Sequence, residues 1–162
     1  MSGRPPGGHT PRMADAISDG ALLEEEDRLW TELRALIDGM PSDQVEQVGY
    51  FEEGWSAKDL IGHIGSWLAE AGVVLERIRF GTYRAEEIQI DAMNKEFFDL
   101  MHDVAFRDVQ AQAVSARTRM LTAWRLLPEP SPEAVRWINK SGPAHYAEHL
   151  PRLKEWVGEL GT

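Results

Sequence analysis

Apolar residues recur at intervals of three and four through most of residues 19–158, and no segment alternates polar and apolar residues as a strand would. This spacing places the apolar side chains on one face of a helix, which must then pack against other helices. The first helical segment shows the pattern at Leu22, Leu29, Leu33, Leu36 and Ile37. The sequence therefore predicts an all-α fold, most simply a four-helix bundle.

Capping residues, glycines and prolines set the expected helix boundaries. Ser56 is a good N-cap, and Asp59 three residues later can complete an acidic capping box. Gly39 and Gly81 follow the last residues of two helices, and Pro143 opens another. The predicted helices cover residues 19–38, 57–80, 85–127 and 143–158, with a short helix or a turn at 133–140.

The segment 85–127 contains no proline or glycine, so it is expected to form one long helix, roughly 60 Å if straight. A bend or break is expected near Arg107 and Asp108, where the apolar stripe is ambiguous. In the last helix Pro151 removes the amide that would bond to Ala147, which predicts a kink.

Three histidines fall on apolar stripes of these predicted helices. His145 and His149 are four residues apart, so both imidazoles leave the same face of one helix. His63 lies between Leu60 and Trp67 on the stripe of another helix. Buried imidazoles without partners are costly, and one metal ion would satisfy several of them. Three imidazole ligands would leave a coordination position open for water or substrate.

Polar residues near these histidines are candidates for a catalytic role. Glu70 lies two turns from His63 on the same helix face and could be a fourth ligand, a general base or an acceptor for an imidazole N–H. Asn94 could hydrogen-bond a ligand or brace the core. Glu148 is expected to project from another face as a solvated carboxylate. His102 is expected at the surface or at the rim of a pocket.

Composition narrows the possible functions. The 162 residues include no cysteine, which rules out disulfides and thiolate ligands and fits a cytoplasmic protein. The net charge of −10 disfavours nucleic acid and anionic membranes as partners. No apolar run reaches the roughly 20 residues of a membrane span. Residues 1–17, which include His9, are expected to form a flexible leader before a single domain over 18–162.

Three short motifs resemble those of the DinB/YfiT-like superfamily. They are the run from Trp55 to Asp59 followed by His63, the segment from Asp91 to Asn94, and the sequence His145-Tyr146-Ala147-Glu148-His149. Within that superfamily the chain is most similar to the branch with the N-terminal domain of mycothiol-dependent maleylpyruvate isomerase, and it also resembles the ClbS/DfsB proteins. The resemblance covers about residues 20–158.

This resemblance implies a four-helix bundle with a long crossover connection and a divalent metal held by His63, His145 and His149. Imidazole ligands suit Zn²⁺, Ni²⁺ or another first-row ion and do not choose among them. It implies a thiol-dependent transferase or isomerase using a low-molecular-weight thiol such as mycothiol, or a hydrolase, acting on a small-molecule substrate. Homodimers occur among such proteins. In the isomerase one of the three ligands is a glutamate, so the three histidines here argue against isomerase activity itself.

Two other interpretations of the same residues stay open. The chain could be a non-catalytic protein that sequesters a small molecule inside the bundle, for example as a self-protection module. It could also be a purely structural bundle whose histidines are neutral and hydrogen-bonded. A bound metal separates the first hypothesis from the last, because it adds stability that a chelator removes.

Overall fold

The computed structural model describes residues 13–162, with side chains from Asp19 onward, and this part of the chain is all-α. Its extended structure is limited to one isolated bridge between Phe51 and Trp55. None of its helices is long and apolar enough to cross a membrane. The helices are α1 (Met13–Asp38), α2 (Ala57–Arg79), α3 (Ile90–Met101), α4 (Phe106–Arg125), α5 (Pro132–Ser141) and α6 (Pro143–Leu160).

The expected leader falls only partly within the described residues. Residues 1–12, with His9, lie outside them. Helix α1 begins at Met13, six residues before the predicted start at Asp19 and inside the range expected to be flexible.

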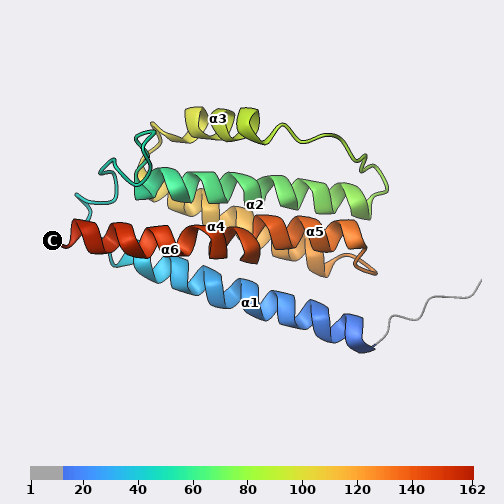
Figure 1. Ribbon diagram of the computed structural model, residues 1–162. Coiled ribbons are helices and arrows are strands. Elements are labelled where there is room, and N and C mark those ends of the chain that lie inside the picture. The colour runs from blue at the N-terminus through green and yellow to red at the C-terminus, as the bar shows by residue number, and fades with distance from the viewer. Residues whose placement is uncertain (1–12) are drawn as a thin grey trace, which may run out of the picture.

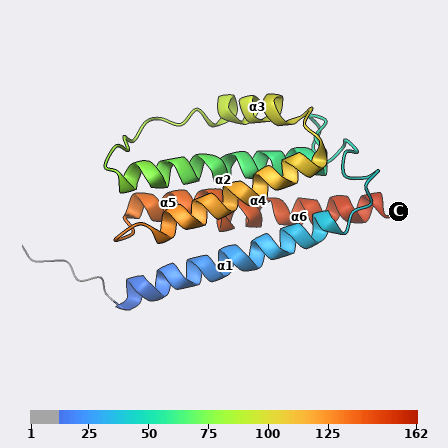
Figure 2. The same cartoon turned by 180° about the vertical axis from the view of Figure 1, so that it is seen from behind.

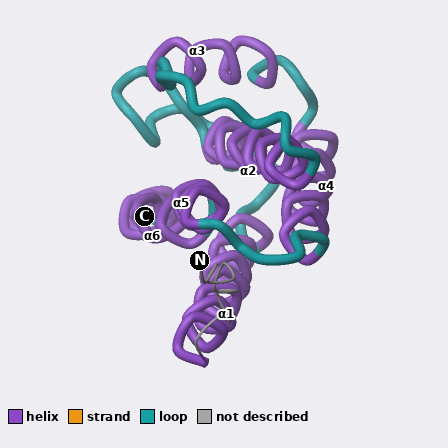
Figure 3. The backbone as a smooth tube through the Cα atoms, turned by 90° about the vertical axis from the view of Figure 1, so that its right-hand side faces the viewer, coloured by secondary structure: helices purple, strands orange, loops and turns teal. Residues whose placement is uncertain are grey.

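Helices α1, α2, α4 and the α5–α6 pair lie alongside one another (Figures 1 and 2). Helices α2 and α4 run in the same direction because the chain returns between them along one side of α2, through α3. Seen along the helices, α3 lies on the side of α2 that faces away from α1 (Figure 3). No residue of α3 is buried, so this helix lies outside the core.

The prediction of one long helix over residues 85–127 is wrong. Residues 82–89 form an irregular segment, which we call the strap, and helices α3 and α4 are separate. The break lies at residues 102–105, a few residues before the expected one. The Nζ atom of Lys58 donates to the backbone carbonyls of His102 (2.6 Å) and Val104 (3.1 Å), and the His102 ring bonds to Asp59. A side chain of α2 therefore binds carbonyls at the break, and no proline or glycine is needed there.

Helix α2 is the central helix, buried on nearly all sides over its first ten residues. Its capping box forms as predicted, with Ser56 and Asp59 each bonding the other's backbone amide. A Cβ atom at Gly65 would lie 2.9 Å from the Cα atom of Ala113, so a glycine is needed for α2 to lie this close to α4. This close contact fixes α2, and His63 with it, against α4.

Helices α5 and α6 follow one another along nearly the same line (Figure 1). Gly142 separates them, and Pro143 opens α6, as the sequence predicted. A Cβ atom at Gly142 would lie 2.8 Å from the Ile138 carbonyl oxygen and 3.3 Å from Cγ of Glu26. The chain can therefore pass this junction without displacing α1 only because a glycine is present.

A buried ion pair links α1, α4 and α6. The Glu26 side chain is 1% exposed and receives two hydrogen bonds from Arg117, at 2.8 and 2.7 Å. The Tyr146 hydroxyl donates a third, at 3.0 Å. Tyr146 follows His145 directly in α6, so this network fixes how α6 is rotated against its neighbours.

We expect Arg117→Met to lower the free energy of unfolding by about 3–5 kcal/mol, because it leaves the Glu26 carboxylate buried and unpaired. The matched control is Arg28→Met, which breaks an exposed pair with Glu25 and should cost far less, because water screens exposed charges. Urea unfolding of the two variants measures the difference. Equal losses would contradict the importance assigned to the buried pair.

Candidate metal centre

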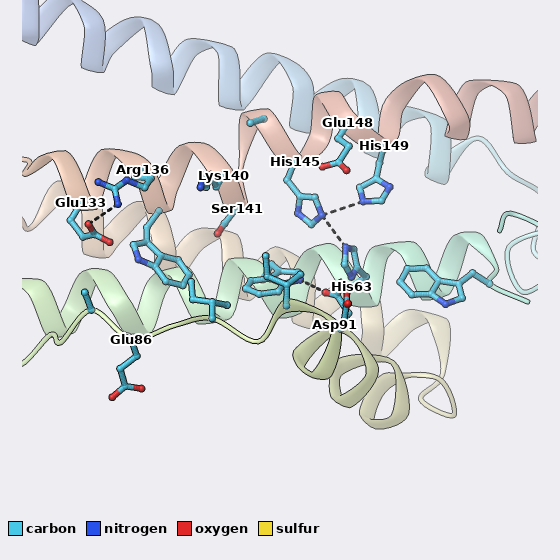
Figure 4. Close-up of a pocket in the computed structure, with 18 of the residues that line it drawn as sticks. His63, Glu86, Asp91, Glu133, Arg136, Lys140, Ser141, His145, Glu148 and His149 are labelled. Carbon is cyan, nitrogen blue, oxygen red and sulfur yellow. Dashed lines mark hydrogen bonds and ion pairs between the residues drawn. The ribbon is translucent and has the colours of Figure 1, made fainter. Parts of the chain in front are cut away.

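Three histidines from two helices converge at one point inside the protein. The Nε2 atom of His145 lies 2.9 Å from Nε2 of His63 and 3.2 Å from Nε2 of His149. One nitrogen from each ring lies within 4.8 Å of the other two, so the group could hold a metal ion (Figure 4). Two ligands of a tetrahedral zinc ion, each about 2.0 Å from it, are about 3.3 Å apart. The His63–His145 and His145–His149 spacings are near that value.

The hydrogen-bonding capacity of these rings shows why a cation bound by all three would suit this site. An imidazole nitrogen carries either a proton or a lone pair, so it makes one good hydrogen bond in the ring plane. Nε2 of His145 has two such neighbours and can satisfy only one of them well. An ion that accepts the lone pairs of all three Nε2 atoms would satisfy every ring at this point.

All three histidines are buried, each with 8% of its surface exposed. Burial lowers the pKa of His63 to about 3, with smaller contributions from His145 and His149. Burial also lowers the pKa of His145 to about 4, helped by His149 and opposed by the Ser141 backbone. The pKa of His149 is lowered by burial and raised in part by Glu148. The rings are thus held in the neutral form that binds metals.

The Nδ1 atoms of the three rings differ in their surroundings. Nδ1 of His149 lies 3.2 Å from the hydroxyl of Tyr50, which is 1% exposed. Burial raises the pKa of this tyrosine far above its usual value, so the phenol stays protonated. Among the described residues, Nδ1 of His63 has no hydrogen-bond partner, and Nδ1 of His145 has no side-chain partner and only the Ser141 backbone near it. Only His149 therefore has a side chain that holds its outer nitrogen.

A cavity of about 940 Å³ opens beside the histidines, within the range of small-molecule sites. The strap and α3 form one wall, and α5 and α6 form the other (Figure 4). Near the histidines the wall is aromatic: Trp55 packs edge-on against His63, with ring centroids 5.2 Å apart, and stacks on Phe98. The other aromatic lining residues are Phe51, Trp67, Tyr83 and Trp137.

The far end of the cavity is polar. Tyr83 of the strap donates a hydrogen bond to Glu133 at 3.0 Å and accepts one from Nε1 of Trp137 at 3.3 Å. Arg136 pairs with Glu133 at 3.1 Å, and Lys140 lies one turn further along the same face of α5. The tyrosine thus attaches the strap to α5 across the cavity.

Asn94 and Glu70, the two candidate catalytic residues, line different cavities. Asn94 lines the cavity, and its Oδ1 atom accepts a hydrogen bond from Nε1 of Trp67 at 2.7 Å. Glu70 lines a smaller cavity of about 420 Å³ instead of the one with the histidines. Seven residues of helix rise about 10 Å, so Glu70 shares a face with His63 but lies too far along α2 to act at the same point. The structure does not bring Glu70 to the histidines.

Glu148 and His102 are both at least partly exposed to solvent. Glu148 is exposed, as expected, but it also lines the cavity and lies beside the histidine pair (Figure 4). The His102 side chain is 43% exposed and bonds to Asp59, so it lies at the surface, one of the two expected places, and it does not line the cavity. The sequence reasoning missed the contact of Tyr50 with His149. It also missed the cavity-lining residues of α5, although Glu133, Arg136 and Lys140 are spaced by three and four and so share one helix face.

Comparisons with known proteins bear on the fold alone. No protein-family model matches the chain, and no curated protein matches its sequence. A crystal structure of an uncharacterised protein from Escherichia coli UTI89 is similar, with a TM-score of 0.72. The match covers 86% of this chain and 92% of the other, at 15% sequence identity. The chain thus shares a helical fold with that protein, and the likeness assigns no activity.

The lowered histidine pKa values predict acid sensitivity of the metal-free protein. The unfolded chain binds a proton on the His145 ring below about pH 6.5, while the folded protein does so only near pH 4, so the free energy of unfolding falls as pH drops between these values. Urea unfolding of chelator-treated protein at pH 7.5 and 5.5 should show a decrease about 1 kcal/mol smaller in His145→Gln than in the original chain. Equal decreases would contradict the assigned burial of His145.

Proposed function

We propose that this protein is a metal-dependent enzyme of the DinB/YfiT-like type, a four-helix bundle with a long crossover that contains the strap and α3. His63, His145 and His149 would hold one divalent ion through their Nε2 atoms. The observation that carries the proposal is the crowding of three neutral, buried Nε2 atoms beside a cavity of small-molecule size. Imidazole ligands suit Zn²⁺ and also Ni²⁺.

Bound at this point, the ion would supply Lewis acidity, which lowers the pKa of a thiol or a water molecule at its open position. We propose a low-molecular-weight thiol such as mycothiol, or water, as the nucleophile and a small electrophile as the substrate. The chain has no cysteine, so any thiol must come from outside it. The activity would be that of a thiol-dependent S-transferase or a hydrolase.

The cavity residues would bind and orient the substrate. The indole N–H of Trp67 donates a hydrogen bond to the side-chain carbonyl oxygen of Asn94. The amide NH₂ group of Asn94 would then donate to a substrate oxygen. The rings of Trp55 and Phe51 cover the histidines on the side of the loop before α2 and keep water from that side. The polar end formed by Arg136 and Lys140 would contact the part of the substrate that does not react.

Metal content tests the site directly. We expect untagged protein, dialysed against zinc, to retain about one equivalent per chain and to melt at a higher temperature than chelator-treated protein. Tight binding should be abolished by each of His63→Ala, His145→Ala and His149→Ala, because two remaining imidazoles are too few ligands to hold the ion. His102→Ala is the control, since its ring bonds to Asp59 outside the site. Less than a tenth of an equivalent in the original chain, with no uptake on titration, would disprove the site.

A second function is favoured by the size and aromatic lining of the cavity, which do not depend on an ion. The protein would then sequester an apolar small molecule without turning it over. A screen of small electrophiles with and without mycothiol separates the two functions. Stoichiometric binding without product, unchanged in His145→Ala, would favour sequestration, whereas product formation lost in His145→Ala would favour the enzyme.

A further inference from the structure

The loop before α2 is fastened to α6 next to the histidines. The guanidinium of Arg152, in α6, donates from Nε to the Tyr50 carbonyl at 2.9 Å and from Nη2 to the Gly49 carbonyl at 3.2 Å. It lies 5.6 Å from the centre of the Tyr50 ring, and Glu159 binds its Nη1 atom at 2.9 Å. The Tyr50 amide donates to the Trp55 carbonyl at 2.9 Å. Both backbone groups of Tyr50 are therefore occupied.

Gly49 permits this close seating. Its φ of 126° lies in the region that side chains rarely adopt, and a Cβ atom there would come within 2.7 Å of the Trp156 ring. The loop can therefore lie directly on α6 only with glycine at this position. The Tyr50 side chain is therefore held in one position, and its hydroxyl is directed at a single target.

That target is His149. The Tyr50 hydroxyl oxygen lies 3.2 Å from Nδ1 of His149 and 3.5 Å from the carbonyl oxygen of the same residue. A carbonyl oxygen only accepts, and a phenol has a single proton. Both contacts form together only when the hydroxyl donates to the carbonyl and accepts from a protonated Nδ1. This arrangement leaves Nε2 of His149 with a free lone pair, directed at the other two histidines.

We infer that Tyr50 is a positioning residue that selects the Nδ1–H tautomer of His149, and that Arg152 holds Tyr50 in place for this task. The inference rests on the metal site proposed above, because the tautomer matters for function only if Nε2 binds an ion. His63 and His145 lack such a partner, so His149 is the ligand whose tautomer the protein sets through a side chain. Partners of this kind raise metal affinity by fixing the ring and its proton.

Nitrogen NMR of the metal-free protein, labelled with ¹⁵N-histidine at pH 7.5, tests the inference without an ion. We expect His149 to be the Nδ1–H tautomer in the original chain and a mixture of tautomers in Tyr50→Phe. Tyr83→Phe is the matched control, because it removes a hydrogen-bonded hydroxyl at the far end of the cavity. It should leave the His149 signals unchanged. An Nε2–H tautomer in the original chain, or no change in Tyr50→Phe, would overturn the assignment.

Zinc affinity, measured by competition with a chelator, provides the second readout. Tyr50→Phe should weaken binding about tenfold to a hundredfold while the far-ultraviolet circular dichroism stays that of the folded chain. Arg152→Met should weaken binding in the same direction and broaden the His149 signals. An Arg152→Met protein with unchanged zinc affinity and unchanged signals would overturn the role of Arg152.

The two readouts keep this inference separate from the proposed function. A chain that takes up no ion, yet loses the Nδ1–H tautomer in Tyr50→Phe, would disprove the metal site and confirm that Tyr50 sets the tautomer. A chain that binds zinc equally well with Phe at position 50 would leave the metal site intact and overturn the positioning role.

Discussion

Three imidazole nitrogens lie at hydrogen-bonding distance where their protons cannot satisfy every contact well, and this constraint governs the centre of the structure. A neutral ring offers one donor and one acceptor, while Nε2 of His145 has two nitrogen neighbours at hydrogen-bonding distance. Protonating a ring does not relieve the conflict, because burial opposes the charged form. The cost must be met by something that binds lone pairs, or by rigid packing that keeps the rings together without it.

The packing around the histidines is rigid on each side. Helix α2 is pressed against α4 at Gly65 and Ala113, and helix α6 is held in rotation by the buried Glu26–Arg117–Tyr146 network. A buried ion pair rarely adds net stability compared with apolar residues of the same size, but it does specify one arrangement. Here the arrangement it specifies is the one that brings His145 to His63.

Much of this could be predicted from sequence, and the failures have physical causes. The i,i+4 spacing of His145 and His149 and their place on a stripe with Leu153 are local properties, and the structure confirms that all three residues are buried. The single long helix predicted over 85–127 is broken a few residues before the expected point, where Lys58, far away in sequence, binds the carbonyls of His102 and Val104. Local helix propensity does not reveal such a tertiary contact.

The candidate site also depends on contacts that the local sequence does not reveal. The contact of Tyr50 with His149 joins residues 99 positions apart and leaves no periodic signal in either segment. Glu70 was misjudged for the opposite reason, since helical periodicity gives the face correctly but says nothing about which turn reaches the cavity. Ile90 and Val114 are exposed, because α3 and α4 are separate helices and no single apolar stripe continues across them.

The junction at Gly142 has a consequence for any ligand of the cavity. Because α5 and α6 continue along one line, the face that carries Arg136 and Lys140 passes into the face that carries His145 and His149. A ligand that contacts both ends of the cavity therefore spans two helices whose relative position depends on the Gly142 backbone. Any residue with a Cβ atom there would press on the Ile138 carbonyl and on Glu26. The spacing between the polar end and the histidines is thus set by the same contact that connects α5 and α6 to α1, so a change in the core would alter the cavity as well.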